Sequence, residues 1–193
     1  MQWHKARGFT LIELMVTIAV LAILLVVAVP SFIEFRERAA VRGAGDQLVS
    51  FWANAKLEAL KRDRPISVSI KKVGATMCMG ASTVITAGCD CFSATACDVD
   101  RYPPVQGDWR GVTMVGLPTL GPTDSDDDGL AVIDPKRGYL ADDDDVGGVT
   151  IQSPGSKVYR LKLHVDRWAK PYLCMPTNSP RKLPDFGTRS CAP

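Results

Sequence analysis

The chain has 193 residues, of which 46% are hydrophobic and 23% charged, with a mean hydropathy of +0.04 and a formal net charge of +2. This composition excludes an intrinsically disordered chain and a protein with many membrane spans, and it leaves enough residues for one globular domain. Residues 90–145 carry 13 acidic and four basic side chains, whereas residues 157–193 carry eight basic and two acidic ones. The two segments therefore have opposite net charges.

The chain opens with a short basic segment, residues 1–8, followed by an apolar run at residues 9–29 that only Glu13 interrupts. A helix of this length covers roughly 31 Å, close to the thickness of the hydrocarbon core of a bilayer. A secretory signal carries a small-residue cleavage site after its apolar region, and residues 28–32 fit that pattern poorly. The sequence therefore predicts a membrane-spanning helix. The natural position for cleavage of the chain is Gly8, before this helix.

The cysteines indicate the orientation of this span. Lys5 and Arg7 precede it, but Arg36, Arg38 and Arg42 follow it, so the basic residues do not decide the orientation. All six cysteines lie beyond the span, an even number that suits disulfides in an oxidising compartment. We therefore expect a single-pass protein of the bacterial inner membrane, with a cytoplasmic N-terminus and a periplasmic C-terminal domain.

Glu13 is unusual because it places a charge in the apolar run. A charged side chain in a membrane helix costs about 2.5 to 3.5 kcal/mol at the centre, and less near an end. If the chain is cut after Gly8, the new amine of Phe9 lies one helical turn before Glu13. That amine can neutralise the carboxylate within the chain or from a neighbouring chain. The alternative is an interfacial acid that reaches water and has no further role.

A second helical pattern follows the membrane span. Apolar residues recur there at three- and four-residue steps, whereas most charged residues fall on other faces. Pro65 makes Arg64 the expected end of the helix. The apolar face comprises Val41, Ala44, Leu48, Phe51, Trp52, Ala55 and Ala59. We therefore expect one continuous helix, half in the membrane and half packed on a globular head.

The periodicity changes to two after Pro65. Residues 66–70 and 159–165 alternate apolar and polar side chains, which predicts half-buried strands. Residues 84–86, 112–117, 130–133 and 149–152 are weaker strand candidates, separated by turns rich in Gly, Pro and Asp. The predicted fold class is therefore α+β, with a long N-terminal helix packed on a β-rich head.

The apolar run begins with the motif Gly8-Phe9-Thr10-Leu11-Ile12-Glu13, and Pro30 lies at its other end. It resembles the class III signal of type IV pilins and type II secretion pseudopilins. The resemblance implies that a prepilin peptidase cleaves between Gly8 and Phe9 and that Phe9 is N-methylated. It implies that Glu13 pairs with the amine of an adjacent subunit during assembly, and that Pro30 kinks the helix.

The same resemblance implies the lollipop organisation of a pilin. Residues 1–8 would be the prepilin leader, and residues 9–30 the helix of the membrane and the filament core. Residues 31–64 would be the amphipathic continuation of the helix, and residues 65–193 the periplasmic β-rich head with a disulfide-bonded C-terminal loop.

The end of the helix and the first strand narrow the resemblance. Residues 55–70 read AKLEALKRDRPISVSI, and this A-x-x-E-A-x-x-R pattern before a strand is similar to the GspH/FimT-like group. The resemblance implies a non-enzymatic minor pilin that helps initiate or cap a type IV pilus, for twitching motility or DNA uptake. The alternative is a minor pseudopilin of a type II secretion system. The implied partners are other pilins or pseudopilins, the prepilin peptidase and the inner-membrane assembly platform, and the implied place is the filament tip.

The resemblance to pilins also implies a disulfide loop near the C-terminus, between Cys174 and Cys191. The other four cysteines can pair in three ways, and they are Cys78, Cys89, Cys91 and Cys97. Cys89 and Cys91 would share one face of a strand, so we expect each to pair elsewhere. A zinc site is the alternative, although its paired C-x-x-C spacing is missing.

An acidic segment favours a metal-binding interpretation. Asp124, Asp126 and Asp128 fit the D-x-D-x-D-G opening of a calcium loop. The twelfth position of such a loop is Pro135 rather than glutamate, so an acid at position 134 or 142–145 would have to close the site. The alternative is a solvated acidic turn. No cofactor is required, and calcium is the only candidate.

A DNA-binding tip subunit is a rival to a purely structural role. Arg181, Lys182 and Arg189 lie in a basic terminal segment that also contains aromatic residues, so cations can meet phosphates and rings can stack on bases. Some FimT-like proteins bind DNA through a C-terminal G-R-x-R motif, from which this sequence departs. The alternative is a solvated cap.

No catalytic residue is expected, because the sequence contains no G-x-S-x-G, H-E-x-x-H or phosphate-loop motif. His164 is the only histidine left after cleavage at Gly8. It falls on the polar side of an alternating strand, where we expect an ordinary surface histidine.

Overall fold

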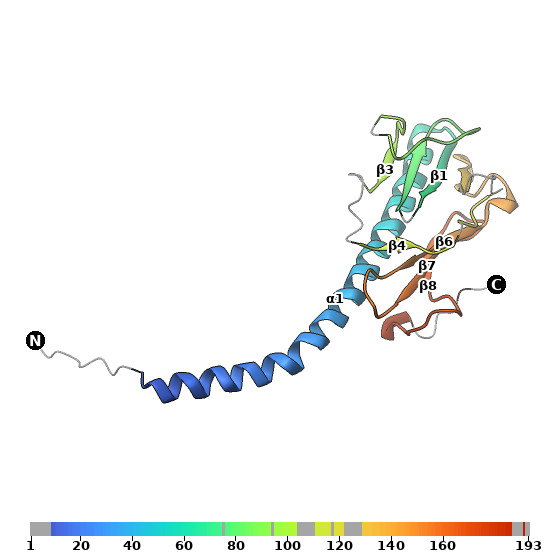
Figure 1. Cartoon of the computed structure of the whole chain (residues 1–193). Coiled ribbons are helices and arrows are strands. Elements are labelled where there is room, and N and C mark those ends of the chain that lie inside the picture. Colours follow the sequence, from blue (N-terminus) through green and yellow to red (C-terminus); the bar gives the residue numbers. More distant parts are fainter. Residues whose placement is uncertain are drawn as a thin grey trace, which may run out of the picture. The chain divides into compact units, whose positions relative to one another are not determined.

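The computed structural model describes residues 9–74, 76–93, 95–103, 111–116, 118–121, 129–186 and 191. Over these residues the chain forms one α-helix, α1 (Leu11–Arg62), followed by two antiparallel β-sheets (Figure 1). This is the α+β, pilin-like architecture that the sequence predicts. The chain divides into two compact units, Met1–Arg36 and Glu37–Pro193.

The end of α1 lies two residues before the predicted Arg64, because a hydrogen-bonded cap closes it. Asp63 adopts a left-handed conformation with φ 47°, and the Arg64 N–H donates to the Ala59 carbonyl at 3.3 Å. This bond is that of a Schellman motif, which satisfies a carbonyl that the helix end leaves unpaired. The helix therefore stops before Pro65 can disturb it.

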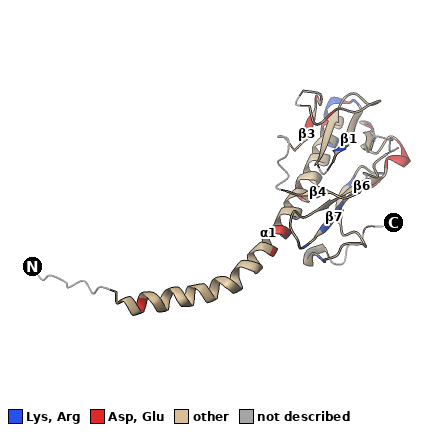
Figure 2. Ribbon diagram, viewed as in Figure 1, with Lys and Arg blue, Asp and Glu red and all other residues tan. Residues whose placement is uncertain are grey.

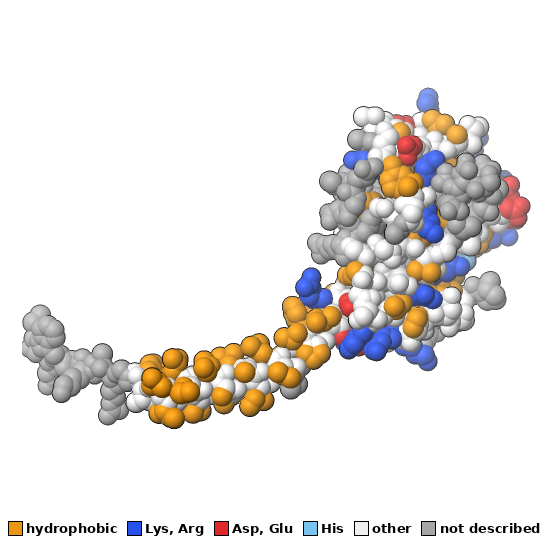
Figure 3. All heavy atoms as spheres, in the orientation of Figure 1, with side chains coloured by type: hydrophobic (Ala, Val, Ile, Leu, Met, Phe, Trp, Pro, Cys, Tyr) orange, Lys and Arg blue, Asp and Glu red, His pale blue; other side chains and the backbone are white. Residues whose placement is uncertain are grey.

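In the first unit, the described residues leave their apolar side chains uncovered. Phe9 is 89% exposed, Leu11 77% and Ile23 68%. Figure 3 shows hydrophobic side chains along the visible face of this stretch. An 18-residue window of α1 has a mean hydropathy of 2.9, so by length and composition the helix can cross a membrane.

In the second unit, α1 buries the apolar stripe that the sequence predicts. All seven positions from Val41 to Ala59 are at most 6% exposed and join the hydrophobic core. Trp52 is fully buried, and its indole Nε1–H donates to the Ala169 carbonyl at 3.2 Å. The helix approaches the sheets closely at Gly45, where a Cβ would lie 2.7 Å from a methyl carbon of Leu161.

The first sheet has the strand order β3-β2-β1-β5. Its strands are β1 (Ile66–Val73), β2 (Thr76–Ser82), β3 (Asp100–Tyr102) and β5 (Gly129–Ile133). In the antiparallel register of the central strand, Val68 lies opposite Ala81 of β2 and Ala131 of β5. The predicted strands at residues 66–70 and 130–133 are therefore confirmed. The candidate at residues 84–86 is wrong, since that segment forms a turn.

The second sheet has the strand order β4-β6-β7-β8. Its strands are β4 (Thr113–Met114), β6 (Gly147–Gln152), β7 (Arg160–Val165) and β8 (Pro171–Cys174). Leu163 of β7 lies opposite Val149 of β6 and Leu173 of β8. Two short 3-10 helices, η1 (Asp143–Asp145) and η2 (Pro184–Phe186), complete the described elements. The predicted strand at residues 112–117 shrinks to the two residues of β4.

The prediction of a half-buried strand is correct for β7 and wrong for β1. Ser67 and Ser69, on the expected polar face of β1, are 0% and 3% exposed. The Ser67 hydroxyl donates to the Val84 carbonyl at 2.8 Å, and the Ser69 hydroxyl donates to the Cys89 carbonyl at 2.9 Å. The segment after β2 therefore covers this face of the sheet, and the serines satisfy its backbone.

Candidate functional site

The first turn of α1 holds Glu13 in a reciprocal pair of contacts with Thr10. The Thr10 backbone N–H and the Thr10 hydroxyl both donate to Glu13 Oε2 at 2.9 Å. The Glu13 backbone N–H lies 3.3 Å from Thr10 Oγ1, which accepts from it. This arrangement is a capping box, in which the N-cap residue and the acid three positions later each satisfy a backbone N–H of the other. The helix start and the acid are therefore one structural unit.

The capping box fixes where the negative charge of Glu13 lies. Both hydrogen bonds use Oε2, and within the described part of the chain Oε1 makes none. A carboxylate has about four lone-pair sites, so it can accept from an amine while it caps the helix. Residues 14–33 carry no Asp, Glu, Lys or Arg, and Figure 2 shows several uncharged turns after the acidic position. The site is thus one carboxylate, held by the helix cap at the start of a long uncharged stretch of α1.

This region also contains Pro30, the other predicted assembly residue, and the predicted processing residues. Pro30 is inside α1, which continues through it although the proline has no N–H to donate to the preceding turn. Phe9 is the first described residue and is almost fully exposed. Gly8, and with it the predicted cleavage junction, lies outside the described residues.

Two disulfides hold the segment after β2 over the first sheet. Cys78 pairs with Cys91, and Cys89 pairs with Cys97, with Cα–Cα distances of 5.7 Å and 5.2 Å. Gly80 is needed beneath them, because a Cβ there would lie 2.4 Å from the Sγ atoms of Cys89 and Cys97. The expected strand around Cys89 and Cys91 is wrong, because both residues lie outside any strand. Each nevertheless pairs with a different cysteine, as expected.

A third disulfide joins Cys174, at the end of β8, to Cys191. The backbone supports this link, because the Cys191 N–H donates to the Met175 carbonyl at 3.3 Å. All six cysteines are therefore in disulfides, which contradicts the zinc alternative. Arg181 and Lys182 lie between the two cysteines and are exposed, whereas Arg189 lies outside the described residues.

The candidate calcium ligands Asp124, Asp126 and Asp128 also lie outside the described residues. Within the parts of the chain that the structure describes, no group of three His, Cys, Asp or Glu side chains is placed to hold a metal ion.

His164 is less exposed than the sequence predicts. Its ring lies against Tyr172, with centroids 5.0 Å apart, and its Nδ1 is buried without a hydrogen-bond partner among the described residues. Burial lowers the pKa of His164, and the nearby positive charge of Lys162 lowers it further. The imidazole is thus held neutral beside a tyrosine ring, without a nucleophile for it to activate among these contacts.

The sequence reasoning missed Thr10, although a signal for it was present. The spacing Thr10-x-x-Glu13 immediately before an apolar run is the sequence signature of a capping box. It also missed a group of aromatic and charged residues around Tyr139 and Trp168, which come from separate turns of the head. No local pattern marks that group.

Comparison with known proteins finds likeness at the N-terminus. Residues 3–29 match the family described as "Prokaryotic N-terminal methylation motif". The chain is also 40% identical over 60 residues to the type IV major pilin protein PilA of Myxococcus xanthus (strain DK1622). This match covers 31% of the chain and 27% of the relative, so the chain spans about a quarter of the curated relative that it matches. No solved structure matches the chain significantly.

Proposed function

We propose that this type IV pilin-like chain is a non-enzymatic subunit that helps initiate or cap a type IV pilus, as a minor pilin. The arrangement at Glu13 carries the proposal, because the capping box anchors one carboxylate at the start of an otherwise uncharged helix. Such a charge has a physical role where helices pack away from water and an amine lies opposite it. The methylation motif at residues 3–29 supports a processed amine at this end of the chain.

The maturation that we propose starts from a membrane-inserted precursor. Residues 1–8 are the leader, and prepilin peptidase cleaves after Gly8 and methylates Phe9. Residues 9–30 then span the inner membrane until an assembly platform moves them into the filament core. The helix continues from residue 31 to Arg62, and the residues after it form the periplasmic head. The exposed apolar side chains of the first unit support this order of events, since lipid or other helices must cover them.

The partners in this proposal are the amines and apolar helices of other pilins. When Glu13 accepts from the methylated amine of Phe9 in the neighbouring subunit, its charge is neutralised and the axial register of the two helices is set. A subunit at the tip has no neighbour above it. Its head is therefore free to present its own surface.

The test of this function is the yield of surface pili from a strain that lacks the gene. Pili are sheared from the cells, and the major subunit is quantified by immunoblotting. We expect loss of pili, with recovery on complementation by the intact gene. Unchanged pili would contradict the proposal. Accumulation of secreted enzymes in the periplasm of the same strain would then assign the chain to a type II secretion system as a pseudopilin.

A DNA-binding tip is tested separately, because Arg181 and Lys182 are exposed and basic, and basic side chains can contact phosphates. The purified chain is titrated with a labelled 20-base-pair duplex at several salt concentrations. Binding that weakens in Arg181→Ala and Lys182→Ala, with a shallower salt dependence, would support this role. Equal binding by the variants, or no salt-sensitive binding, would remove it.

A further inference from the structure

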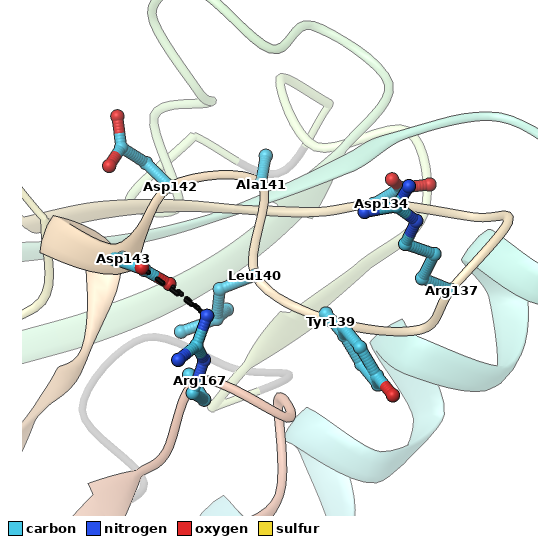
Figure 4. Close-up of a pocket in the computed structure, with 8 residues that line it drawn as sticks. All are labelled: Asp134, Arg137, Tyr139, Leu140, Ala141, Asp142, Asp143 and Arg167. Atoms are coloured by element: carbon cyan, nitrogen blue, oxygen red, sulfur yellow. Dashed lines mark hydrogen bonds and ion pairs between the residues drawn. The ribbon is translucent and has the colours of Figure 1, made fainter.

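A pocket on the surface of the head is formed by two turns that lie far apart in the sequence. Its volume is about 380 Å³, within the range of roughly 300 to 1,000 Å³ that is typical of small-ligand sites. One side is the turn that follows β5, and the other is the turn between β7 and β8. Figure 4 shows the residues that surround it, which include Asp134, Arg137, Tyr139, Asp142, Asp143 and Arg167.

The first turn is held by its own backbone. The Asp134 N–H donates to the Tyr139 carbonyl at 2.8 Å, and the Gly138 N–H donates to the Asp134 carbonyl at the same distance. Gly138 has φ 64°, a conformation that favours glycine. The Asp134 carboxylate accepts from the Lys136 N–H at 2.7 Å. The backbone that presents Arg137 and Tyr139 is therefore fixed before any ligand binds.

The second turn is tied to the first turn and to the helix. The Asp166 carboxylate accepts from the backbone N–H groups of Trp168 and Lys170 at 3.0 Å and 2.9 Å. The Leu140 N–H donates to the Arg167 carbonyl at 3.0 Å, which joins the two turns. Lys56 Nζ donates to the Trp168 carbonyl at 2.8 Å, which joins the second turn to α1. Both sides of the pocket thus rest on the scaffold of the head.

Among the residues that line the pocket, Tyr139 supplies an aromatic ring and Arg167 a guanidinium, and Trp168 packs against Tyr139 outside the lining. Tyr139 and Trp168 pack edge to face with ring centroids 4.4 Å apart, yet Tyr139 is 37% exposed and Trp168 is 50% exposed. The Arg167 guanidinium lies 6.0 Å from the centre of the Trp168 ring. It also forms an ion pair with Asp143 at 3.0 Å, which Figure 4 shows as a dashed line. Aromatic surface that stays open to solvent beside an oriented guanidinium is typical of a recognition surface.

The charges around the pocket define the ligand that fits it. Its carboxylates, from Asp134, Asp142 and Asp143, can only accept hydrogen bonds, whereas the guanidinium groups of Arg137 and Arg167 can only donate them. A ligand that satisfies both sets must offer donors and acceptors close together. A hydroxyl group does both, and a sugar ring carries several hydroxyls around a C–H face that can lie on an aromatic ring.

We propose that this pocket binds a neutral saccharide, with Tyr139 against the sugar ring and the paired Arg167 and Asp143 at its hydroxyls. A nucleic acid fits less well, because its phosphates only accept hydrogen bonds and would face three carboxylates. A metal ion has no site here, since no group of three ligating side chains is found among the described residues. Binding is a property of the head itself, so it does not depend on the proposed role in pilus assembly.

The test uses the full chain purified in lauryldimethylamine oxide, a detergent without a sugar headgroup. Maltose, cellobiose and N,N′-diacetylchitobiose are titrated by isothermal calorimetry, after a screen on an array of neutral glycans. We expect at least one neutral saccharide to bind with a dissociation constant between about 10 µM and 10 mM, the range of a few hydrogen bonds and one stacked ring.

The variants assign this binding to the pocket. Tyr139→Ala and Arg167→Ala should each weaken it at least tenfold, whereas Tyr139→Phe, which keeps the ring, should change it less than threefold. Arg62→Ala is the matched control, because Arg62 is also an exposed arginine paired with an acid, Glu58, away from the pocket. Near-ultraviolet circular dichroism verifies that each variant is folded.

Three outcomes would overturn the proposal. The first is that none of the neutral saccharides binds at concentrations up to about 10 mM. The second is saccharide binding that Tyr139→Ala and Arg167→Ala leave unchanged. The third is binding of a 20-base-pair DNA duplex, but of no saccharide, that Arg167→Ala weakens and Arg62→Ala does not, which would assign the pocket to a nucleic acid.

Discussion

The two halves of α1 differ in whether their apolar side chains are covered by the rest of the chain. Both are rich in apolar residues, but the described side chains of residues 9–33 are exposed, whereas the stripe from Val41 to Ala59 is buried against the sheets. The second half is covered by its own chain and the first half is not. From this difference we expect the head to be stable by itself, and the first half to need a membrane or other helices to cover its surface.

The prediction with the largest expected effect separates the charge of Glu13 from its role in capping the helix. Glu13→Gln keeps an acceptor for the capping box but loses the charge, whereas Thr10→Val keeps the charge but loses the hydroxyl. We expect Glu13→Gln to lower the amount of the chain in sheared filaments at least about tenfold, because it removes the charge from the ion pair that we propose with a neighbouring amine. Thr10→Val should have a much smaller effect, since a lost cap costs about 1 kcal/mol.

Immunoblots of sheared filaments and of membranes measure these two variants. Both proteins should be present in the membrane fraction in normal amounts, and the thermal unfolding of the head should not change. If Glu13→Gln assembles normally while Thr10→Val does not, the acid acts by capping the helix and the proposed pairing with an amine is wrong.

The second prediction concerns the half of α1 that the sheets cover. Trp52→Ala removes a fully buried indole together with its hydrogen bond to the Ala169 carbonyl. We expect the free energy of unfolding of the head to fall by about 3 to 5 kcal/mol, the usual loss for this truncation in a core. Urea denaturation followed by circular dichroism measures it. Leu57→Ala is the control, because Leu57 is on the same helix but 50% exposed and should change stability by less than about 0.5 kcal/mol.

The third test removes the link across the C-terminal segment. Cys174 and Cys191 are 17 residues apart, so the double variant Cys174→Ser, Cys191→Ser should lower the stability of the head by about 3 kcal/mol. The physical reason is the larger conformational entropy of the unfolded chain without the cross-link. Urea denaturation without reductant measures the loss. An unchanged midpoint would mean that the disulfide only restrains a segment that unfolds separately from the core.

The smallest expected effect concerns Asp98. Its side chain accepts hydrogen bonds from Ser82 and Thr83, so it holds the segment after β2 against the end of that strand. Burial alone would raise the pKa of Asp98, but hydrogen bonds from Thr83 and Ser82 outweigh it and lower the pKa to about 2. A folded-state pKa below the unfolded one stabilises the fold above about pH 4, and this contribution is lost as the pH falls toward 2. We expect Asp98→Ala to cost about 1 kcal/mol at pH 7, because solvent screens this exposed carboxylate.

Urea denaturation at pH 7 and at pH 2.5 measures this contribution. The difference between the wild type and Asp98→Ala should shrink at the lower pH. A difference of the same size at both pH values would mean that the ionised carboxylate is not responsible. Asp90→Ala is a suitable control, since within the described residues its side chain accepts a single local bond, from the Phe92 N–H.

The sequence predicts the helix well because its signals are local. The apolar stripe has the period of a helix, and Gly8-Phe9 with Glu13 marks the boundary of the membrane segment within six residues. The sheets were only partly predictable. β2 reads TMCMGAS and is buried on both faces, so it has no alternation to find, and Ser67 and Ser69 look like surface residues until the disulfide-bonded segment covers them.

The candidate sites also differ in how far they could be predicted from the sequence. Glu13 and its partner Thr10 are three residues apart, so a capping box can be found by inspection. Tyr139 and Trp168 meet only because β7 and the helix place their turns together, and no sequence pattern spans that distance. The pairing of four neighbouring cysteines is likewise a result of tertiary structure, since their spacing is compatible with three arrangements.

The crossed pairing of those cysteines constrains how the head is made. In the proposed topology, the part of the head nearest the membrane span emerges first, so Cys78 and Cys89 would reach the oxidising compartment before Cys91 and Cys97. Oxidation in order of arrival would join Cys78 to Cys89, but the folded head joins Cys78 to Cys91 and Cys89 to Cys97. The native links must therefore form after the whole segment has emerged, or be reshuffled by thiol–disulfide exchange. In the proposed topology, a head that oxidises while it is still emerging therefore needs disulfide exchange to reach its native pairing, whereas a head that oxidises after it has emerged does not.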